Sequence, residues 1–255
     1  GDEEAGCTRG TEWLRNSGAY GELDYVIVGE QTNNLVAVAE RGFHFFTVTI
    51  KGKACHGAMP WNGNNAAVHA ARFINLIDRE FVPKLKKKTH PYLPYSTVNV
   101  AGFKSGIKWN VVPEVAEVVI DRRSVPGETL KSVTDELIEM LERLKAEDPF
   151  EYEIRCDQDS GKPTNTDPND PMIKAMLQAT QEVAHVRTEP VGYHQGCDAR
   201  LFSHLNIPIA IFGPSDPAVG HAPNERVSVK QLVEASKIYA LTALRVLGVQ
   251  DDTEV

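Results

Sequence analysis

The stretch FHFFTVTI at residues 43–50, followed by NGNNAAVHAARFINLI at residues 62–77, decides the fold. The first run is β-branched and aromatic, which is the composition of a β-strand. The second begins with asparagines and continues with apolar residues at helical spacing, which predicts a capped amphipathic helix. Together they predict a strand–helix pair, the unit from which layered α/β proteins are built.

The elements that follow extend this pair into a known pattern. Strands are predicted around residues 96–103, 116–122 and 151–155, and a second helix over 129–145. The resulting order, β-α-β-β-α-β, is typical of a ferredoxin-like sandwich, in which two helices cover a four-stranded sheet. We assign this domain to residues 43–159, which is a normal domain size.

The residues on both sides predict a separate α/β domain. Tyr25–Val28 is a short apolar run that indicates a buried strand, and it delivers Glu30 at its end. The later elements alternate as in an α/β layer: helices over 171–183 and 229–247, a glycine-rich turn over 192–198, a further helix, and a strand over 207–212. The two halves of this domain are residues 1–42 and 160–255, with the ferredoxin-like domain inserted between them.

Composition limits the class of function. The net charge of −8 argues against a nucleic-acid binder, which normally carries a basic face. No apolar run approaches the roughly 20 residues of a membrane span, and no signal peptide is found. The four cysteines lack the short paired spacing of a zinc ribbon or a redox motif, and they fit a reducing compartment. We therefore expect a cytoplasmic protein that binds neither nucleic acid nor membrane.

Six short motifs follow one another along the chain: DEE at 2–4, VGE at 28–30, GKACHG at 52–57, NVVP at 110–113, GCDAR at 196–200 and GHAPNE at 220–225. Each motif alone is weak. Together and in this order they make the chain similar to the M20 family of metallopeptidases and amidohydrolases, which includes acetylornithine deacetylase, succinyl-diaminopimelate desuccinylase and related carboxypeptidases. The similarity covers essentially the whole chain.

The resemblance implies a zinc-peptidase-like catalytic domain, present in part, whose inserted ferredoxin-like domain is a lid and dimerisation domain. It also implies that Glu3 is the general acid/base and that Glu4, Glu30 and His221 bind metal. Two adjacent carboxylates suit a divided task, because one can bind a metal while the other takes a proton from activated water. Imidazole suits zinc as a ligand. One departure is Gln31, which stands where the family usually has proline after the glutamate.

The resemblance also gives roles to residues outside the metal site. His56, reaching from the partner subunit, would stabilise the oxyanion that develops on the substrate carbonyl. Asn110 would make a polar contact, and Gly196 lies in a turn that would line the substrate pocket. Arg123 would anchor a substrate carboxylate with its planar fork. Arg122 is the competing assignment, since strand alternation puts the two arginines on opposite faces.

The metal ligands are incomplete in this sequence. The chain begins without an initiating methionine in what resembles the middle of a motif, and the family's upstream His-x-Asp and bridging Asp are not found. We expect a substantial N-terminal part to be missing here. The intact protein is then expected to hold two Zn²⁺ ions, with cobalt or manganese as alternatives, while this segment alone binds metal weakly or not at all and is inactive.

The expected reaction is hydrolysis of the amide bond of an N-acyl amino acid, of the deacetylase or desuccinylase type. Cleavage of a di- or tripeptide or of a C-terminal residue is the alternative within the family. A non-catalytic relative that acts through its dimerisation domain is the alternative outside it. A homodimer is expected through the lid, by the strand at 43–50 or the helix at 62–77. A Cys197–His194 nucleophilic pair is also conceivable, but no third orienting group is evident.

Overall fold

The computed structural model describes residues 9–186 and 189–248, and the chain divides into two compact units. Unit 2 consists of Gly42–His90 and Pro94–Gly161. Unit 1 consists of the described residues up to Arg41, the short segment Pro91–Leu93, and the described residues from Lys162 onward. Each unit has its own sheet and its own apolar core.

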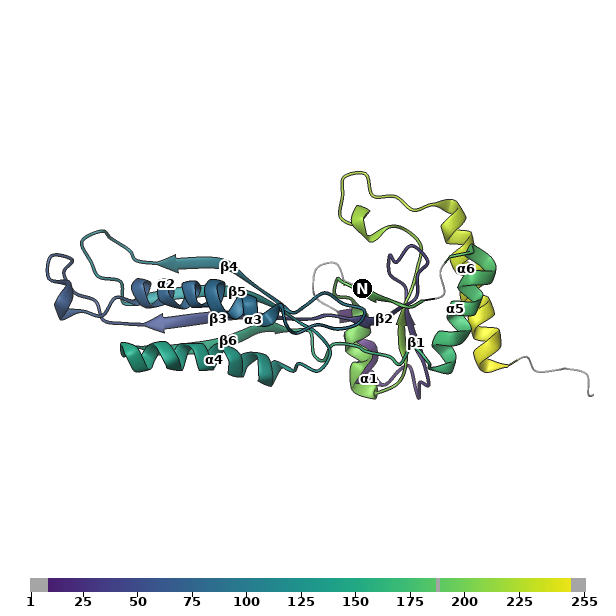
Figure 1. Ribbon diagram of the computed structural model, residues 1–255, viewed down its shortest axis with the longest axis horizontal. Helices are drawn as coiled ribbons and strands as arrows, with labels where there is room; N and C mark the ends of the chain where they lie inside the picture. The colour runs from purple at the N-terminus through teal and green to yellow at the C-terminus, as the bar shows by residue number, and fades with distance from the viewer. Residues whose placement is uncertain (1–8, 187–188, 249–255) are drawn as a thin grey trace, which may run out of the picture. The chain divides into compact units, whose positions relative to one another are not determined.

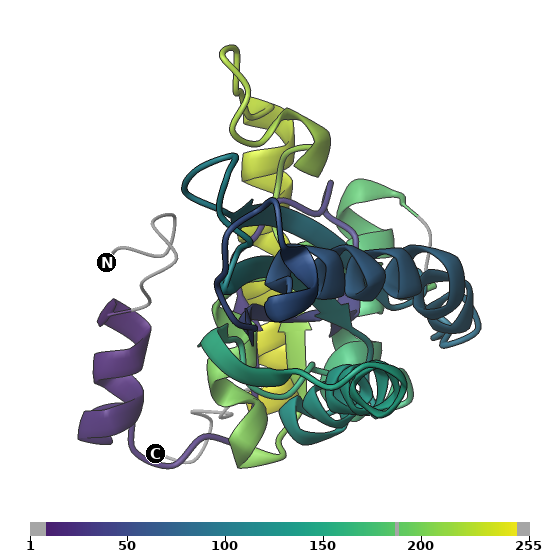
Figure 2. The same cartoon turned by 90° about the vertical axis from the view of Figure 1, so that its left-hand side faces the viewer.

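Unit 2 is an antiparallel sheet in the order β4-β5-β3-β6 with helices packed on it. Its strands are β3 (Gly42–Lys51), β4 (Thr97–Ser105), β5 (Val115–Ser124) and β6 (Glu151–Asp159). Its helices are η2 (Pro60–Asn62), α2 (Ala66–Leu76), the π-helical turn η3 (Ile77–Phe81), α3 (Val82–Leu85) and α4 (Leu130–Glu147). In chain order this is the predicted β-α-β-β-α-β arrangement, so the ferredoxin-like fold is confirmed. Figure 2 shows the blue α2–α3 run beside the teal α4.

The helices of unit 2 begin where their capping residues satisfy free backbone N–H groups. The side chain of Asn65 accepts hydrogen bonds from the backbone N–H of Ala67 at 3.0 Å and of Val68 at 3.4 Å. Thr129 and Ser132 form a reciprocal capping box at the start of α4. These caps fix both helix starts, as the asparagine-rich stretch before α2 predicts.

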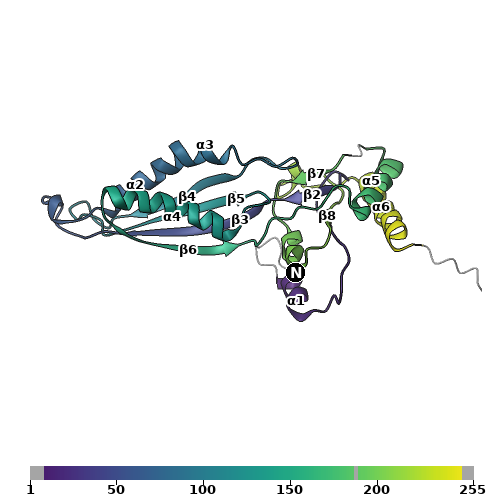
Figure 3. The same cartoon turned by 60° about the horizontal axis from the view of Figure 1, so that its bottom comes forward.

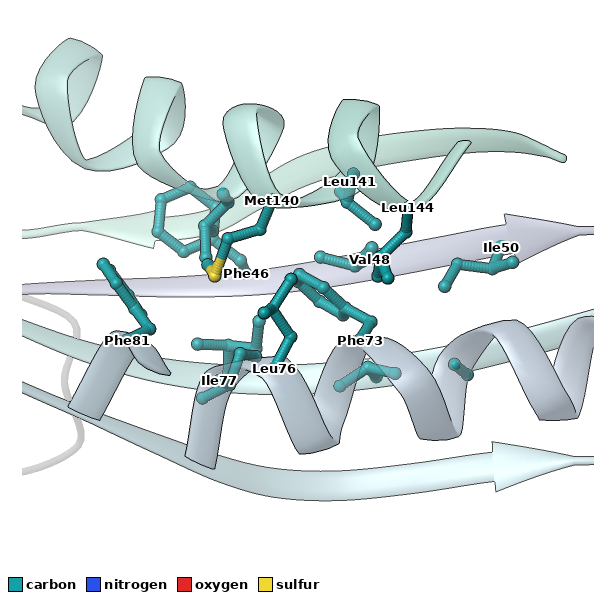
Figure 4. Close-up of a cluster of buried hydrophobic side chains, with 14 of the residues drawn as sticks. Phe46, Val48, Ile50, Phe73, Leu76, Ile77, Phe81, Met140, Leu141 and Leu144 are labelled. Atoms are coloured by element: carbon teal, nitrogen blue, oxygen red, sulfur yellow. The ribbon is translucent and has the colours of Figure 1, made fainter. Parts of the chain in front are cut away.

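The core of unit 2 lies between the sheet and its helices. Alternate residues of β3 and β5 point to the same face, and Phe46 lies opposite Ile120 as Val48 lies opposite Val118. Phe73 of α2 and Leu141 of α4 are fully buried against them. Figure 4 shows side chains from both helices converging on β3. Because one face of the sheet takes both helices, Figure 3 shows α2, α3 and α4 lying along it together.

A network of charged side chains is enclosed in this helix-facing layer. Arg122, which is fully buried, donates to the carboxylates of Glu128 and, at 3.2 Å, of Glu136. Lys88 Nζ lies 2.8 Å from Glu128 and 2.6 Å from Glu136. The neighbouring Arg123 lies on the opposite face of β5. Arg122 is thus buried in the core of unit 2, where it pairs with two glutamates. Of the two arginines, only Arg123 could contact a substrate.

Removing Glu128 should destabilise unit 2 strongly, because the buried Arg122 would lose a charged partner while remaining away from water. We expect Glu128→Ala to lower the free energy of unfolding by about 3–5 kcal/mol, measured by urea denaturation. Glu139→Ala is the matched control, since its pair with Lys84 spans 3.9 Å between mostly exposed side chains and should contribute almost nothing. Equal losses in the two variants would contradict this assignment.

Unit 1 is built on a short mixed sheet in the order β1-β8-β2-β7. Its strands are β1 (Val26–Val28), β2 (Ala37–Glu40), β7 (Val191–Tyr193) and β8 (Ile209–Ile211). Its helices are α1 (Arg9–Ser17), α5 (Pro171–Ala184), η4 (Asp198–Leu205), η5 (Pro217–Val219) and α6 (Val229–Leu247). β8 runs parallel to β1 and antiparallel to β2, and β7 runs parallel to β2.

The two central strands of unit 1, β8 and β2, bury both of their faces. Ala210 packs with α5 and α6, which lie side by side in Figure 1, whereas Ile209 and Ile211 pack on the other face with residues of η4. Apolar residues on both faces indicate a sheet covered on both sides. Together with unit 2 this confirms the predicted α/β fold class. In the described ranges, no helix combines the length and apolar character needed to cross a membrane.

Four details of unit 1 differ from the sequence-based expectation. Strand β7 occupies the start of the predicted glycine-rich turn, and the helix after that turn is a 3-10 helix. Helix α1 and strand β2 were not predicted. The sequence of β2, AVAE, is buried at every position and has no alternation to indicate a strand.

Candidate active site

Glu30 stands just beyond the end of β1, as predicted, and a tyrosine from β7 holds its carboxylate. Tyr193 Oη lies 3.0 Å from Glu30 Oε2 and 2.9 Å from Gln195 Oε1, two acceptors for its single proton. Burial and the nearby Glu30 carboxylate raise the pKa of Tyr193, so its hydroxyl remains a donor. The backbone of Glu30 is equally confined, because a Cβ at Gly213 would lie 2.5 Å from the Glu30 carbonyl oxygen.

His221 lies in the loop after η5 and is linked to the Glu30 loop through one carboxylate. Glu225 Oε2 accepts a hydrogen bond from the backbone N–H of His221 at 3.1 Å, and Glu225 Oε1 accepts one from Gln31 Nε2 at 2.7 Å. His221 has a φ of +59°, in the left-handed region. The structure therefore brings together the loops that carry these two predicted metal ligands, and Gln31 takes part in the link.

The donor types at these loops fit zinc, which takes carboxylate oxygen and imidazole nitrogen. The described residues, however, bring together too few of these side chains to hold a zinc ion. Within residues 9–186 and 189–248, no three or more His, Cys, Asp or Glu side chains are grouped so as to hold a metal ion. Glu4, the third predicted ligand, and Glu3, the predicted base, lie outside the described residues. The metal site therefore stays a prediction.

His56 and Asn110 lie in unit 2 on two loops that touch. His56 forms an isolated antiparallel bridge with Val111, and the N–H of Gly57 donates to the Asn110 carbonyl at 2.8 Å. His56 Nδ1 accepts a hydrogen bond from the N–H of Ala58 at 3.1 Å. In the neutral imidazole the proton is then on Nε2, so the exposed ring presents an N–H donor.

Arg123, also in unit 2, has a partner of its own. Its Nε and Nη2 lie 2.7 Å and 3.0 Å from the two carboxylate oxygens of Asp121. Its guanidinium also lies over the rings of Phe43 and Phe45, with centroids at 5.4 Å and 5.5 Å. A substrate carboxylate would therefore have to share the Arg123 guanidinium with Asp121 or displace the Asp121 carboxylate from it.

A cavity of about 620 Å³ lies within unit 1 beside these loops. Gln31 and Tyr193 line it, as do His194 and Gln195, which directly precede the predicted Gly196. Gly196 itself is not among the lining residues. The sequence indicated a substrate pocket near this turn but not the residues that form its walls, because they come from well-separated parts of the chain.

A second carboxyl group, which no sequence pattern indicates, lies beside the pocket residue Tyr193 in the sheet. Glu40, at the end of β2, is completely buried and accepts a hydrogen bond from the backbone N–H of Cys197. Burial raises the pKa of Glu40 to about 8, an effect opposed by the Cys197 N–H and by Arg200. Burial and Glu40 together raise the pKa of the Cys197 thiol as well. A buried, protonated thiol is a poor nucleophile, which argues against the Cys197–His194 pair.

The buried Glu40 should make the stability of unit 1 depend on pH. Its pKa in the folded protein, about 8, is above its ordinary value of 4.5. The folded state therefore holds a proton that the unfolded chain has lost. The stabilisation is complete below pH 4.5 and is lost as the pH rises through 8. Between pH 4.5 and pH 8, the free energy of unfolding of wild type should fall by about 4–5 kcal/mol relative to that of Glu40→Gln. Urea denaturation at several pH values measures this loss, with the exposed Glu22→Gln as control. Parallel curves for wild type and Glu40→Gln would contradict it.

The fold and the site together define a class: an α/β protein interrupted by a ferredoxin-like domain, with a carboxylate and an imidazole on adjoining loops. Residues 38–149 match the peptidase dimerisation domain of the M20 family. The chain is 28% identical to acetylornithine deacetylase of Myxococcus xanthus over 250 residues, which are 97% of this chain and 63% of that protein. The predicted resemblance to the M20 family is thereby confirmed.

Further comparisons agree. A probable succinyl-diaminopimelate desuccinylase of Staphylococcus epidermidis is 25% identical over 256 residues, covering 90% of this chain and 62% of that protein. The fold is similar to that of a dinuclear metal-binding M20 peptidase of Bacillus subtilis, with a TM-score of 0.73 at 18% identity, over 96% of this chain and 63% of that one. The chain thus spans a little under two thirds of the length of these relatives.

Proposed function

We propose that the complete protein is a metal-dependent hydrolase that cleaves the amide bond of an N-acyl amino acid. The observation that carries this proposal is the link through Glu225, which places the loops of Glu30 and His221 next to each other. The deacetylase and desuccinylase among its relatives support the substrate class. A short peptide is the second candidate, because similar folds belong to peptidases.

Glu4, Glu30 and His221 would hold two Zn²⁺ ions together with ligands from outside this sequence, with cobalt or manganese as alternatives. A bound zinc ion supplies water whose pKa is lowered to about 7. Tyr193 supports this assignment of Glu30, because carboxylates that bind metals are themselves oriented by hydrogen bonds.

The other residues would handle the proton and the substrate. Glu3 takes the proton of the attacking water and gives it to the leaving amine. The Nε2–H of His56 donates to the oxyanion on the substrate carbonyl. Arg123 binds the substrate carboxylate, Asn110 adds a polar contact, and Gly196 contributes to the substrate-binding turn.

A homodimer through unit 2 completes the proposal and is supported by the match to a dimerisation domain. Of the two surfaces considered from the sequence, the strand at 43–50 is paired on both edges, with β5 and β6. Helix α2 keeps an exposed apolar residue, Val68. Helix α2 is therefore the proposed contact surface of the two-fold dimer.

Removing the proposed base should abolish hydrolysis without removing the metal. We expect Glu3→Gln in the complete protein to lose at least about a thousandfold in kcat on N-acyl amino acids. Elemental analysis should still find about two zinc ions per chain. Glu22→Gln serves as the control that retains activity. Retained activity in Glu3→Gln would overturn the base assignment, and an absence of both metal and hydrolysis in wild type would favour the non-catalytic alternative.

Mixing two inactive variants tests whether His56 acts on the partner's site. In a mixed dimer of His56→Ala and Glu3→Gln chains, the site with an intact Glu3 would receive the intact histidine of the other chain. Random mixing should then restore about a quarter of wild-type activity, because half of the dimers are mixed and each has one complete site. A His56 that acts within its own chain would restore none.

A further inference from the structure

The pocket in unit 1 has walls of an unexpected chemical type. None of the fourteen described residues that line it is Asp, Glu, Lys or Arg. Leu35, Tyr92, Val191 and Pro217 give it an apolar and aromatic lining, while amide and hydroxyl groups and the His194 imidazole supply its polar atoms. A carboxylate entering such a space would lose hydration without meeting a lysine or arginine among the described lining residues, which is unfavourable.

The pocket lies directly beside the proposed reaction centre. Tyr193, whose hydroxyl binds Glu30 Oε2, is one of its lining residues. Gln31 lines it and is held by Glu225. Two of its lining segments also touch each other, since Gln195 Nε2 lies 3.5 Å from the Pro217 carbonyl oxygen. A substrate whose amide is held at Glu30 would therefore extend a neighbouring group into this pocket.

One wall is fixed by a close approach between distant segments. A Cβ at Gly192 would lie 2.0 Å from the carbonyl oxygen of Tyr92 and 2.7 Å from the Leu93 side chain. Glycine at this position thus lets the segment Pro91–Leu93 pack directly on β7, with Leu93 buried. This wall of the pocket is therefore held by packed backbone, as is usual for pockets that are formed before a ligand binds.

We infer that this pocket receives a bulky uncharged acyl group, aromatic or aliphatic, and selects against a dicarboxylic one such as succinyl. The inference rests on the proposed amide hydrolysis. The volume of about 620 Å³ is typical of pockets that hold whole small molecules and is far more than an acetyl group fills. Apolar walls reward each added carbon of the acyl chain.

Substrates that differ only in the acyl group test this directly. For the complete protein we expect kcat/KM to be at least about tenfold higher for the N-phenylacetyl derivative of one amino acid than for its N-succinyl derivative. Acetyl should fall below phenylacetyl. In the non-hydrolysing Glu3→Gln variant, calorimetry should give the same order of affinities.

A charge placed at the pocket should change the preference. His194 is exposed and lines the pocket, so His194→Arg should bring a cation within reach of a succinyl carboxylate. The ratio of kcat/KM for the phenylacetyl compound to kcat/KM for the succinyl compound should then fall by at least about tenfold. His204→Arg is the matched control, because His204 is exposed on η4 and does not line the pocket. Its ratio should stay at the wild-type value.

The outcomes separate the two proposals. Equal or better hydrolysis and binding of the succinyl compound by wild type would overturn the pocket inference while leaving amide hydrolysis intact. Preferential binding of the phenylacetyl compound without hydrolysis of any amide by wild type would overturn the proposed reaction and support the pocket assignment. An unchanged ratio in His194→Arg would contradict the placement of the acyl group in this pocket.

Discussion

The arrangement of the candidate site depends on the carboxylate of Glu225. One oxygen holds the Gln31 side chain and the other holds the backbone of His221, so a single group fastens two loops that are far apart in the sequence. The Gln31 side chain also lies close to the backbone before His221, since a Cβ at Gly220 would lie 2.9 Å from Gln31 Oε1. The link matters because surface loops without such support seldom hold ligand atoms in fixed positions.

Two buried carboxyl groups show how environment decides protonation in this protein. Burial acts to raise the pKa of both Glu128 and Glu40. At Glu128, Arg122, Lys88 and Ser96 together outweigh that effect, so its pKa is below the ordinary value and the group is an anion in an ion-pair network. At Glu40 the opposing groups are too few, and the carboxyl keeps its proton. A glutamate side chain is therefore a buried anion in unit 2, at Glu128, and a neutral hydrogen-bonding group in unit 1, at Glu40.

The sequence predicted best the elements whose residues repeat with a clear period. Helix α6 runs from Val229 to Leu247 behind its Ser228 cap, as expected, and the β-α-β-β-α-β order of unit 2 is correct. Strands β1 and β8 are equally short but lie in apolar runs, whereas β2 shows no alternation and β7 contains a glycine that favoured a turn. The loops of Glu30 and His221 could be identified from their motifs. Tyr193 and Glu40 could not, because their importance comes from tertiary contacts that no local pattern records.

The assignment of Pro91–Leu93 to unit 1 has a consequence for how these units can be separated. The segment lies between two parts of unit 2 in the sequence, so the chain crosses from one unit to the other four times: after residues 41, 90, 93 and 161. A continuous piece spanning 42–161 would carry Leu93 away from the β7 backbone on which it packs. Unit 2 is therefore not a modular cassette that could be cut out or transplanted through two junctions. Any exchange of this domain between related proteins must also keep a compatible glycine at position 192.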